Sequence, residues 1–335
     1  MAPPYFSGRL LRIVVFLVLF LCVLWASAAL YLDTRVQWLR IVMPVVFLLA
    51  VIAVFFGVRR RVLAVGLCFG LVAAVITWWL TLSPSNDANW QRDVAETPWA
   101  EVAGDKVTIH NFRNFDYTTE TDYRPNWETR TVDLSSLQGI DLFMNYWGSP
   151  VIAHTILSFQ FANSLPVAIS IETRKQVGQS YSAVLGFFRQ FALIYVIGDE
   201  RDIVRVRTNY RKGEDLYVYR TRAVPARARA IFLDYLKSAN DLRDHPEWYN
   251  ALTSNCTVNI MPHLRVMGVQ HDVPWDWRIL LNGYADQMAY DRGMLAGDLP
   301  FSELKLRAHI NDAARLGDQS PDFSRLIRAG RPGFD

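Results

Sequence analysis

Three long apolar runs near the start of the 335-residue sequence constrain this chain more than any other feature. They cover residues 10–30, 41–58 and 62–82, and each is long enough for a helix to cross about 30 Å of hydrocarbon. A cleaved signal peptide would have a shorter apolar core, and two further runs would not follow it. The sequence therefore predicts three N-terminal transmembrane helices.

Arginine placement predicts how these helices are oriented. Arg9 and Arg12 stand at the start of the first run, and the consecutive arginines at 59–61 fill the short link between the second and third runs. With three spans, both clusters lie on the same side of the membrane, and basic residues favour the cytoplasmic side. We therefore expect residues 1–9 in the cytoplasm and the chain after residue 82 on the outer face.

The rest of the sequence has the composition of an ordinary globular domain. Residues 83–96 are polar and are interpreted as a linker, and residues 97–335 are enough to bury a full core. A net charge of +3 without a basic face gives no argument for nucleic-acid binding. The sequence also lacks metal-ligand spacings and glycine-rich phosphate loops, so we expect no metal and no cofactor.

Hydrophobic patterning predicts an α+β domain in which an antiparallel sheet precedes helices. Residues 154–161 and 167–173 have the alternation and β-branched content of two strands, and the short turn between them predicts a hairpin. The other strand patterns cover residues 106–112, 129–134, 140–146, 191–197, 203–208 and 216–219. After Pro225 apolar residues recur at helical spacing, and we expect further helices at residues 247–252 and from Cys256 onward.

Cys256 is the single cysteine outside the predicted membrane spans. It follows Thr253, Ser254 and Asn255, which are good N-cap residues, so we expect it in the first turn of a helix. There the helix dipole and the unpaired backbone N–H groups stabilise a thiolate and could hold an oxyanion. The alternative is a small buried hydrophobe, which is what most free cysteines are.

A thiol nucleophile needs a base within hydrogen-bond reach, and His154 has the most suggestive position among the histidines. It opens a strand directly after the break at Gly148-Ser149-Pro150, where an imidazole could be aimed at the N-terminus of a helix. His263 is too far from Cys256, because a spacing of seven residues corresponds to about 10 Å along one helix. A structural role beside apolar residues is the alternative for His154.

The strand after His154 carries a carboxylate that could orient the imidazole. Period-two alternation places Ser170, Glu172 and Arg174 on one face of this strand. Glu172 is the better candidate for the third member of a catalytic triad, and Ser170 is the other. The alternative for Glu172 is an ion pair with Arg174, or with Arg205 or Arg207 from a later segment.

Motifs across this region resemble those of one known family. In chain order they are Phe115-Asp116-Tyr117, Trp147-Gly148-Ser149-Pro150, His154-Thr155, Ser170-Ile171-Glu172-Thr173-Arg174, Tyr181-Ser182-Ala183-Val184, Gly186-Phe187-Phe188-Arg189, Glu200-Arg201-Asp202, Arg207-Thr208-Asn209-Tyr210-Arg211 and Trp248-Tyr249-Asn250-Ala251-Leu252-Thr253-Ser254-Asn255-Cys256-Thr257. The set is similar to the periplasmic domain of Lnb-type proteins, a family long catalogued as a domain of unknown function. The resemblance covers roughly residues 105 to 270.

The resemblance implies a fold related to permuted papain-like thiol enzymes of the NlpC and lecithin–retinol acyltransferase type. In these enzymes the histidine strand precedes the cysteine helix, and the order His154, Glu172, Cys256 matches that permutation. It also implies a bacterial inner-membrane protein with residues 97–335 as a periplasmic catalytic domain. In the name-giving members the catalytic domain comes first and membrane segments follow, whereas here three spans precede it.

The name-giving members are lipoprotein N-acyltransferases, so the resemblance implies a membrane-anchored cysteine acyltransferase. Cys256 would take an acyl chain from a phospholipid or diacylglyceryl ester as a thioester, with His154 as base and Glu172 as its orienting group. The acceptor would be an amine, with a lipoprotein N-terminus as the expected partner. Two alternatives stay open: a thiol hydrolase of lipid esters or cell-wall peptides, and a non-catalytic, membrane-tethered binding module.

Overall fold

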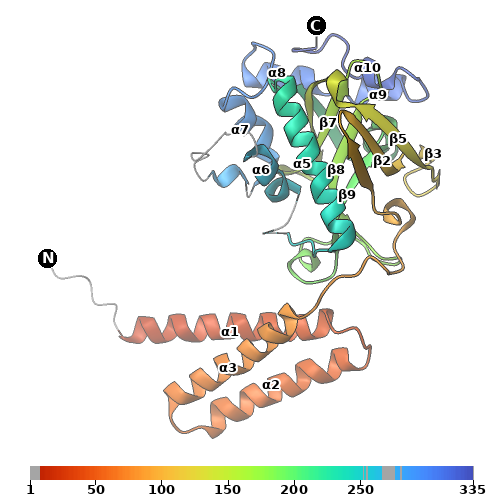
Figure 1. Cartoon of the computed structure of the whole chain (residues 1–335). Helices are drawn as coiled ribbons and strands as arrows, with labels where there is room; N and C mark the ends of the chain where they lie inside the picture. Colours follow the sequence, from red (N-terminus) through yellow and green to blue (C-terminus); the bar gives the residue numbers. More distant parts are fainter. Residues whose placement is uncertain (1–7, 252, 254–255, 266–275, 280, 335) are drawn as a thin grey trace, which may run out of the picture. The chain divides into compact units, whose positions relative to one another are not determined.

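The apolar runs form three N-terminal helices in the computed structural model of the chain. They are α1 (Gly8–Leu32), α2 (Leu39–Gly57) and α3 (Arg61–Leu80) (Figure 1). The structure describes residues 8–251, 253, 256–265, 276–279 and 281–334. Within these residues, the three helices are long and apolar enough to cross a membrane. Many of their large apolar side chains are exposed, as lipid-facing side chains would be.

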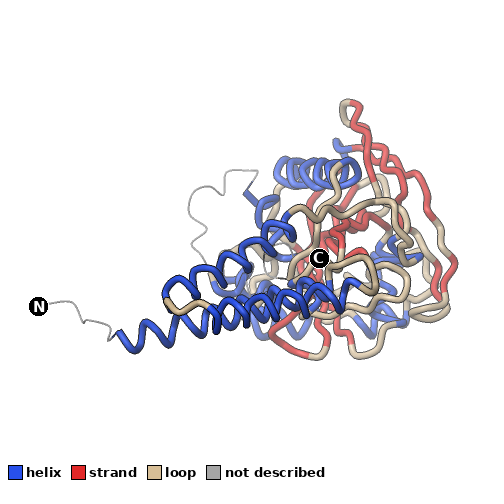
Figure 2. The backbone as a smooth tube through the Cα atoms, turned by 90° about the horizontal axis from the view of Figure 1, so that it is seen from below, coloured by secondary structure: helices blue, strands red, loops and turns tan. Residues whose placement is uncertain are grey.

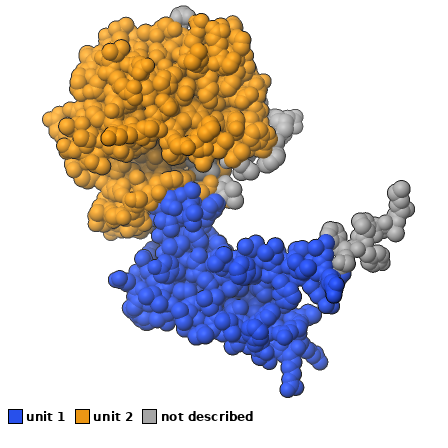
Figure 3. Space-filling view, turned by 180° about the vertical axis from the view of Figure 1, so that it is seen from behind, with its two compact units in different colours: residues 1–84, 182–191 blue, residues 85–181, 192–335 orange. Residues whose placement is uncertain are grey.

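The chain divides into two compact units that do not follow a single cut in the sequence (Figure 3). Residues 1–84 and 182–191 form the helical unit, and residues 85–181 and 192–335 form the globular unit. Within the helical unit, the backbone N–H of Arg189 and the side-chain amide of Gln190 bind Asp33 Oδ1 at 3.1 and 2.6 Å. The indole N–H of Trp79 donates to Asp33 Oδ2 at 2.7 Å, so a buried carboxylate ties residues 182–191 to the helices.

The globular unit contains an eight-stranded, mostly antiparallel sheet among its described residues. The strand order is β1-β2-β9-β8-β7-β6-β10, and β5 pairs with β2. The sheet strands are β1 (Trp99–Ala103), β2 (Lys106–Arg113), β5 (Trp127–Asp133), β6 (Leu137–Trp147), β7 (Ser149–Phe161), β8 (Val167–Arg174), β9 (Ala192–Gly198) and β10 (Glu214–Arg220), and a separate pair consists of β3 (Asp116–Tyr117) and β4 (Tyr123–Arg124). β9 is buried throughout, which explains its continuous apolar sequence.

Helices lie on both faces of the sheet (Figure 2). The helices of the globular unit are α4 (Glu200–Ile203), η4 (Val206–Tyr210), α5 (Pro225–Asp244), α6 (Cys256–Arg265), α7 (Ala285–Asp291), α8 (Phe301–Ala308), α9 (Asn311–Leu316) and α10 (Phe323–Leu326), with short turns η1 (Arg92–Val94), η2 (Leu134–Ser136), η5 (Trp277–Ile279) and η6 (Asn282–Tyr284). The short turn η3 (Leu185–Phe187) belongs to the helical unit. On one face, Phe232 of α5 packs against Phe159 of β7 with ring centroids 4.8 Å apart. On the other face, Phe143 and Ile156 belong to one core cluster with apolar residues of α4, α9 and α10. The α+β prediction is therefore confirmed, and the permuted papain-like topology stays a prediction.

A buried ion cluster fixes the C-terminal helices to the sheet. Arg328 Nε binds Asp141 Oδ2 of β6, and Arg328 Nη1 binds Glu200 Oε2 of α4, each at 2.7 Å. Both carboxylates are fully buried. Because each charge has a hydrogen-bonded partner, the cluster avoids the large penalty of an isolated buried ion.

Two segments differ from the sequence-based prediction. Residues 203–208 were predicted as a strand and are helical instead, because Asp199 caps α4 by accepting a hydrogen bond from the N–H of Arg201 at 2.9 Å. The helix expected at residues 247–252 is not formed in its described part. There the N–H of Leu193 donates to the carbonyl of Glu247 at 2.8 Å, so the segment pairs with the start of β9.

Residues 83–96, which the sequence predicts as a linker, make specific contacts with the globular unit. Asn86 donates to the carbonyl of Arg243 in α5 at 2.7 Å, and Trp90 forms a β-bridge with Gln176. Most of this segment therefore belongs to the globular unit, which begins at Ser85.

Candidate active site

β7 and β8 bring three of the predicted side chains together at one end of the sheet. Ile156 lies opposite Ser170 in the register of the two strands, which places His154 beside Glu172. His154 Nε2 is 2.6 Å from Ser170 Oγ, and Ser170 Oγ is 2.6 Å from Glu172 Oε1. The direct distance from His154 Nε2 to Glu172 Oε1 is 3.2 Å. Both candidates for the third residue therefore contact the same imidazole nitrogen.

The hydrogen-bond order assigns the imidazole tautomer. A serine hydroxyl has one proton, and the ionised carboxylate of Glu172 can only accept. Ser170 therefore donates to Glu172 and accepts from the Nε2–H of His154. In the neutral imidazole, this leaves the lone pair on Nδ1, which is the nitrogen that would take a proton from a thiol.

Glu172 also makes an ion pair with Arg207 of η4, so the orienting role and the ion-pair alternative are both present. Arg207 is buried, whereas the side chain of Glu172 remains 25% exposed. Burial opposes the charge of Glu172, but His154, Arg207 and the hydroxyl of Ser170 outweigh it and hold the pKa of Glu172 well below its usual range. The carboxylate is therefore ionised whenever the domain is folded near neutral pH.

The other two arginines considered as partners of Glu172 bind elsewhere. Arg174 Nε donates to the carbonyl of Val94 at 2.9 Å, and Arg205 Nη2 binds Asp116 Oδ1 at 3.0 Å. Sequence reasoning named Arg207 as an alternative and not as a site residue, although it opens one of the motifs that carry the family resemblance. That motif was the available signal for its role.

Helix α6 begins at Cys256, as the N-cap residues predicted. It packs against β7, β8 and α5. The side chain of Cys256 lies outside the described residues, as do Ser254 and Asn255. The position of its thiol therefore stays a prediction from the backbone.

His263, which is too far along α6 to serve as the base, anchors that helix. Its Nδ1 is 2.6 Å from Asp234 Oδ2 of α5, and its Nε2 is 2.8 Å from the hydroxyl of Tyr195 in β9. The ring centroid also lies 3.9 Å from that of Tyr235. Burial lowers the pKa of His263, although Asp234 opposes this effect. The imidazole is thus a buried link between α5, α6 and the sheet.

Strand alternation places His154 and α6 on opposite faces of the sheet. Tyr195 contacts α6 through His263, and its partner in the register is Ile171, which points away from the face of Ser170 and Glu172. Sequence reasoning did not foresee this arrangement.

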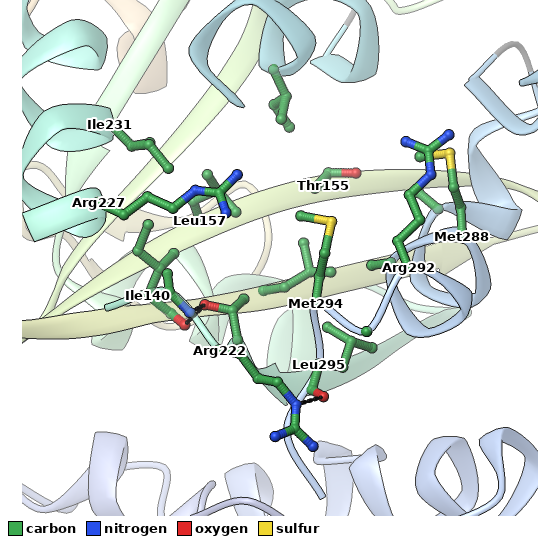
Figure 4. Close-up of a pocket in the computed structure, with 17 residues that line it drawn as sticks. Ile140, Thr155, Leu157, Arg222, Arg227, Ile231, Met288, Arg292, Met294 and Leu295 are labelled. Carbon is green, nitrogen blue, oxygen red and sulfur yellow. Dashed lines mark hydrogen bonds between the residues drawn. The ribbon is translucent and has the colours of Figure 1, made fainter. Parts of the chain in front are cut away.

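A cavity of about 300 Å³ lies on the α6 face of the sheet (Figure 4). Its walls come from separate segments of the globular unit: β6, β7, α5, α6, α7 and the chain on either side of them. Thr155, which follows His154, and Ile260, one turn after Cys256, both line it. The side chain of His154 points to the opposite face of the sheet, and no local sequence pattern predicted the cavity.

Comparison with known proteins supports the resemblance. Residues 123–283 match the sequence model of the Lnb N-terminal periplasmic domain, and this range includes His154, Glu172 and Cys256. No curated protein and no solved structure matches the chain. Together with the three apolar helices, the match indicates an inner-membrane protein with a periplasmic C-terminal domain. The match supports the assignment of residues 123–283 to an Lnb-type periplasmic domain.

Proposed function

We propose that this protein is a membrane-anchored cysteine acyltransferase that modifies an amine at the outer leaflet of the inner membrane. The observation that carries the proposal is the His154–Ser170–Glu172 relay on β7 and β8, the two strands against which the helix that begins at Cys256 packs. In this proposal residues 1–9 are cytoplasmic, and the helices confine the site to the plane that holds its lipid substrate. Confinement raises the effective concentration of that substrate.

In the first half-reaction, Nδ1 of His154 takes the proton of the Cys256 thiol. The sulfur attacks the carbonyl carbon of a lipid ester, and the backbone N–H groups at the start of α6 stabilise the oxyanion. The C–O bond then breaks, His154 returns the proton to the departing alkoxide, and a thioester remains on Cys256. Glu172 stabilises the imidazolium through Ser170.

In the second half-reaction, an amine attacks the thioester carbonyl while His154 accepts its proton. The C–N bond forms, the C–S bond breaks, and the proton passes back to the sulfur, which restores the thiol. A lipoprotein N-terminus is the proposed acceptor. If water took the place of the amine, the same residues would perform ester hydrolysis.

The test uses the full chain in vesicles that contain a phospholipid with a fluorescent acyl chain. We expect a hydroxylamine-labile label on the wild-type chain, and transfer of this label to an added peptide with an N-terminal diacylglyceryl-cysteine. Cys256→Ala and His154→Gln should each abolish the labelled chain. The matched control replaces Cys22 and Cys68, which lie in α1 and α3, and should label normally.

Each contrary outcome selects another function. Labelled free fatty acid without labelled peptide would indicate a hydrolase with the same Cys–His pair. Normal labelling of Cys256→Ala would overturn the nucleophile assignment. A wild-type chain that never carries label, and whose thiol reacts slowly with a maleimide probe at neutral pH, would indicate a binding module.

A further inference from the structure

The loop at residues 182–191 has an apolar sequence that is unusual for an exposed segment. Six consecutive residues, 183–188, carry no polar side chain. Within this run, Val184 is 66% exposed and Phe187 is 45% exposed. Surfaces that face water avoid exposed apolar runs, and where such runs occur they mark contact sites. The loop is therefore a candidate contact surface.

Hydrogen bonds hold the loop at the ends of α1 and α3, within the helical unit (Figure 3). The side-chain amide of Gln190 donates to the carbonyl of Leu32, the last residue of α1, at 2.9 Å. Arg189 Nη1 donates to the carbonyl of Leu82, just beyond the end of α3, at 2.6 Å. The guanidinium carbon of Arg189 also lies 4.2 Å from the ring centroid of Trp79. Tryptophan and arginine side chains at the ends of spans favour the headgroup region, so these contacts place the loop at the depth of the membrane surface.

The backbone of the loop can enter apolar surroundings because hydrogen bonds within the turn satisfy it. The N–H of Gly186 donates to the carbonyl of Ser182 at 2.9 Å. The N–H of Phe187 donates to the carbonyl of Val184 at 3.2 Å. An unpaired peptide group is costly in hydrocarbon, so these bonds lower the cost of moving the turn out of water.

Continuity with the membrane spans identifies lipid as the occupant of this surface. Large apolar side chains are exposed along α1, α2 and α3, and lipid is the environment that such side chains favour. The loop is hydrogen-bonded to the ends of two of these helices, so Val184 and Phe187 border the same lipid. A segment with exposed apolar side chains at this depth gains free energy by entering the boundary between headgroups and acyl chains.

We propose that the turn at residues 183–187 inserts into this boundary, with Val184 and Phe187 in contact with lipid. The loop lies in the connection between β8 and β9, so the membrane contacts the chain at a second place, far in sequence from the three spans. The inference goes beyond the proposed function and does not depend on it, because it uses no residue of the proposed catalytic cluster.

The test places an environment-sensitive NBD fluorophore on single cysteines of the full chain in phospholipid vesicles. The native cysteines are first replaced as Cys22→Ser, Cys68→Ala and Cys256→Ala. Val184→Cys then carries the probe in the loop. Phe20→Cys is the control inside the membrane, because Phe20 is exposed in the middle of α1, and Leu316→Cys is the control in water, because Leu316 is exposed at the end of α9.

Lipids with bromine near the headgroup end or near the methyl end of the acyl chains measure the depth of each probe, and iodide measures its access to water. At position 184 we expect stronger quenching by the shallow bromines than by the deep ones, and little loss of emission to iodide. The order of the two bromolipids should reverse at position 20. Iodide alone should quench the probe at position 316.

A second probe at Phe187→Cys keeps the test decisive if the label at position 184 disturbs the turn, which thermal unfolding would show. Quenching of both loop probes by iodide and not by bromolipids would overturn the inference. Loop probes that are protected from iodide and from both bromolipids would also overturn it, because protein then covers the loop, either the globular unit or a second copy of the chain. Thioester formation on Cys256 is measured separately on the unlabelled chain, so the two proposals can fail independently.

Discussion

Replacing Glu172 by glutamine should separate the two roles that its carboxylate has in the structure. Removal of one partner from a buried ion pair costs about 3–5 kcal/mol, because the other charge is left without compensation. Arg207 is that charge, and its side chain is 3% exposed. Water can reach Glu172, which is 25% exposed, so we discount the loss in unfolding free energy to about 2–3 kcal/mol. For a domain of this size, that corresponds to a melting temperature lower by about 4–12 °C.

A second substitution distinguishes structure from chemistry. Arg207→Met in the Glu172→Gln background removes the unpaired guanidinium and should restore most of the lost stability. It should not restore activity, because an uncharged glutamine cannot stabilise the imidazolium of His154. We expect thioester formation to stay about 10²–10⁴-fold below wild type in both variants.

The measurements are thermal unfolding by tryptophan fluorescence and the rate of acyl labelling of the full chain. Glu128→Gln is the matched control, because Glu128 is 30% exposed and pairs with Arg130 at 2.6 Å in β5, away from His154. It should change neither quantity by much. If the double variant recovers both stability and labelling, Glu172 is an ion-pair partner alone, and the orienting role is refuted.

Two further predictions concern the anchors of α6 and of the C-terminal helices. Burial lowers the pKa of His263, so the unfolded chain binds the extra proton below the ordinary value of about 6.5, and stability should fall as the pH drops from 7 to 5. His263→Gln should make that fall shallower in urea titrations, and a slope equal to that of the wild type would contradict this account. Arg328→Met should lose about 3–5 kcal/mol in the same assay, because it leaves Asp141 and Glu200 buried without it. Arg325→Met, whose ion pair is exposed, should lose less than about 1 kcal/mol, and equal losses would argue against the cluster.

The parts of the fold that could be predicted are those set by local patterns. The apolar runs and the β7–β8 hairpin follow from residues that are close together in the sequence, and the start of α6 at Cys256 is equally local. Residues 203–208 have a strand-like composition, but the hydrogen bond that the Asp199 carboxylate accepts from the N–H of Arg201 in the first turn of α4 favours a helix. The local structure of this segment thus depends on one capping side chain, and the average composition of the segment does not reveal it.

The parts of the site that could not be predicted depend on distant segments. Alternation predicts that His154 and Glu172 share a face, but it does not say which helices cover that face. Arg207 reaches Glu172 from a helical turn that was expected to be a strand. The cavity required residues from Ile140 to Leu295 to be placed together, which is a property of the whole globular unit.

The inclusion of residues 182–191 in the helical unit has a practical consequence for protein production. A fragment that starts at Ser85 would keep this loop but lose Asp33, and it would also lose the indole of Trp79, over which Arg189 lies at 4.2 Å. The loop also carries Val184 and Phe187, which are exposed in the full chain, and on a fragment without its membrane helices these apolar side chains would face water and invite self-association. A soluble version should therefore replace the whole loop with a short polar bridge.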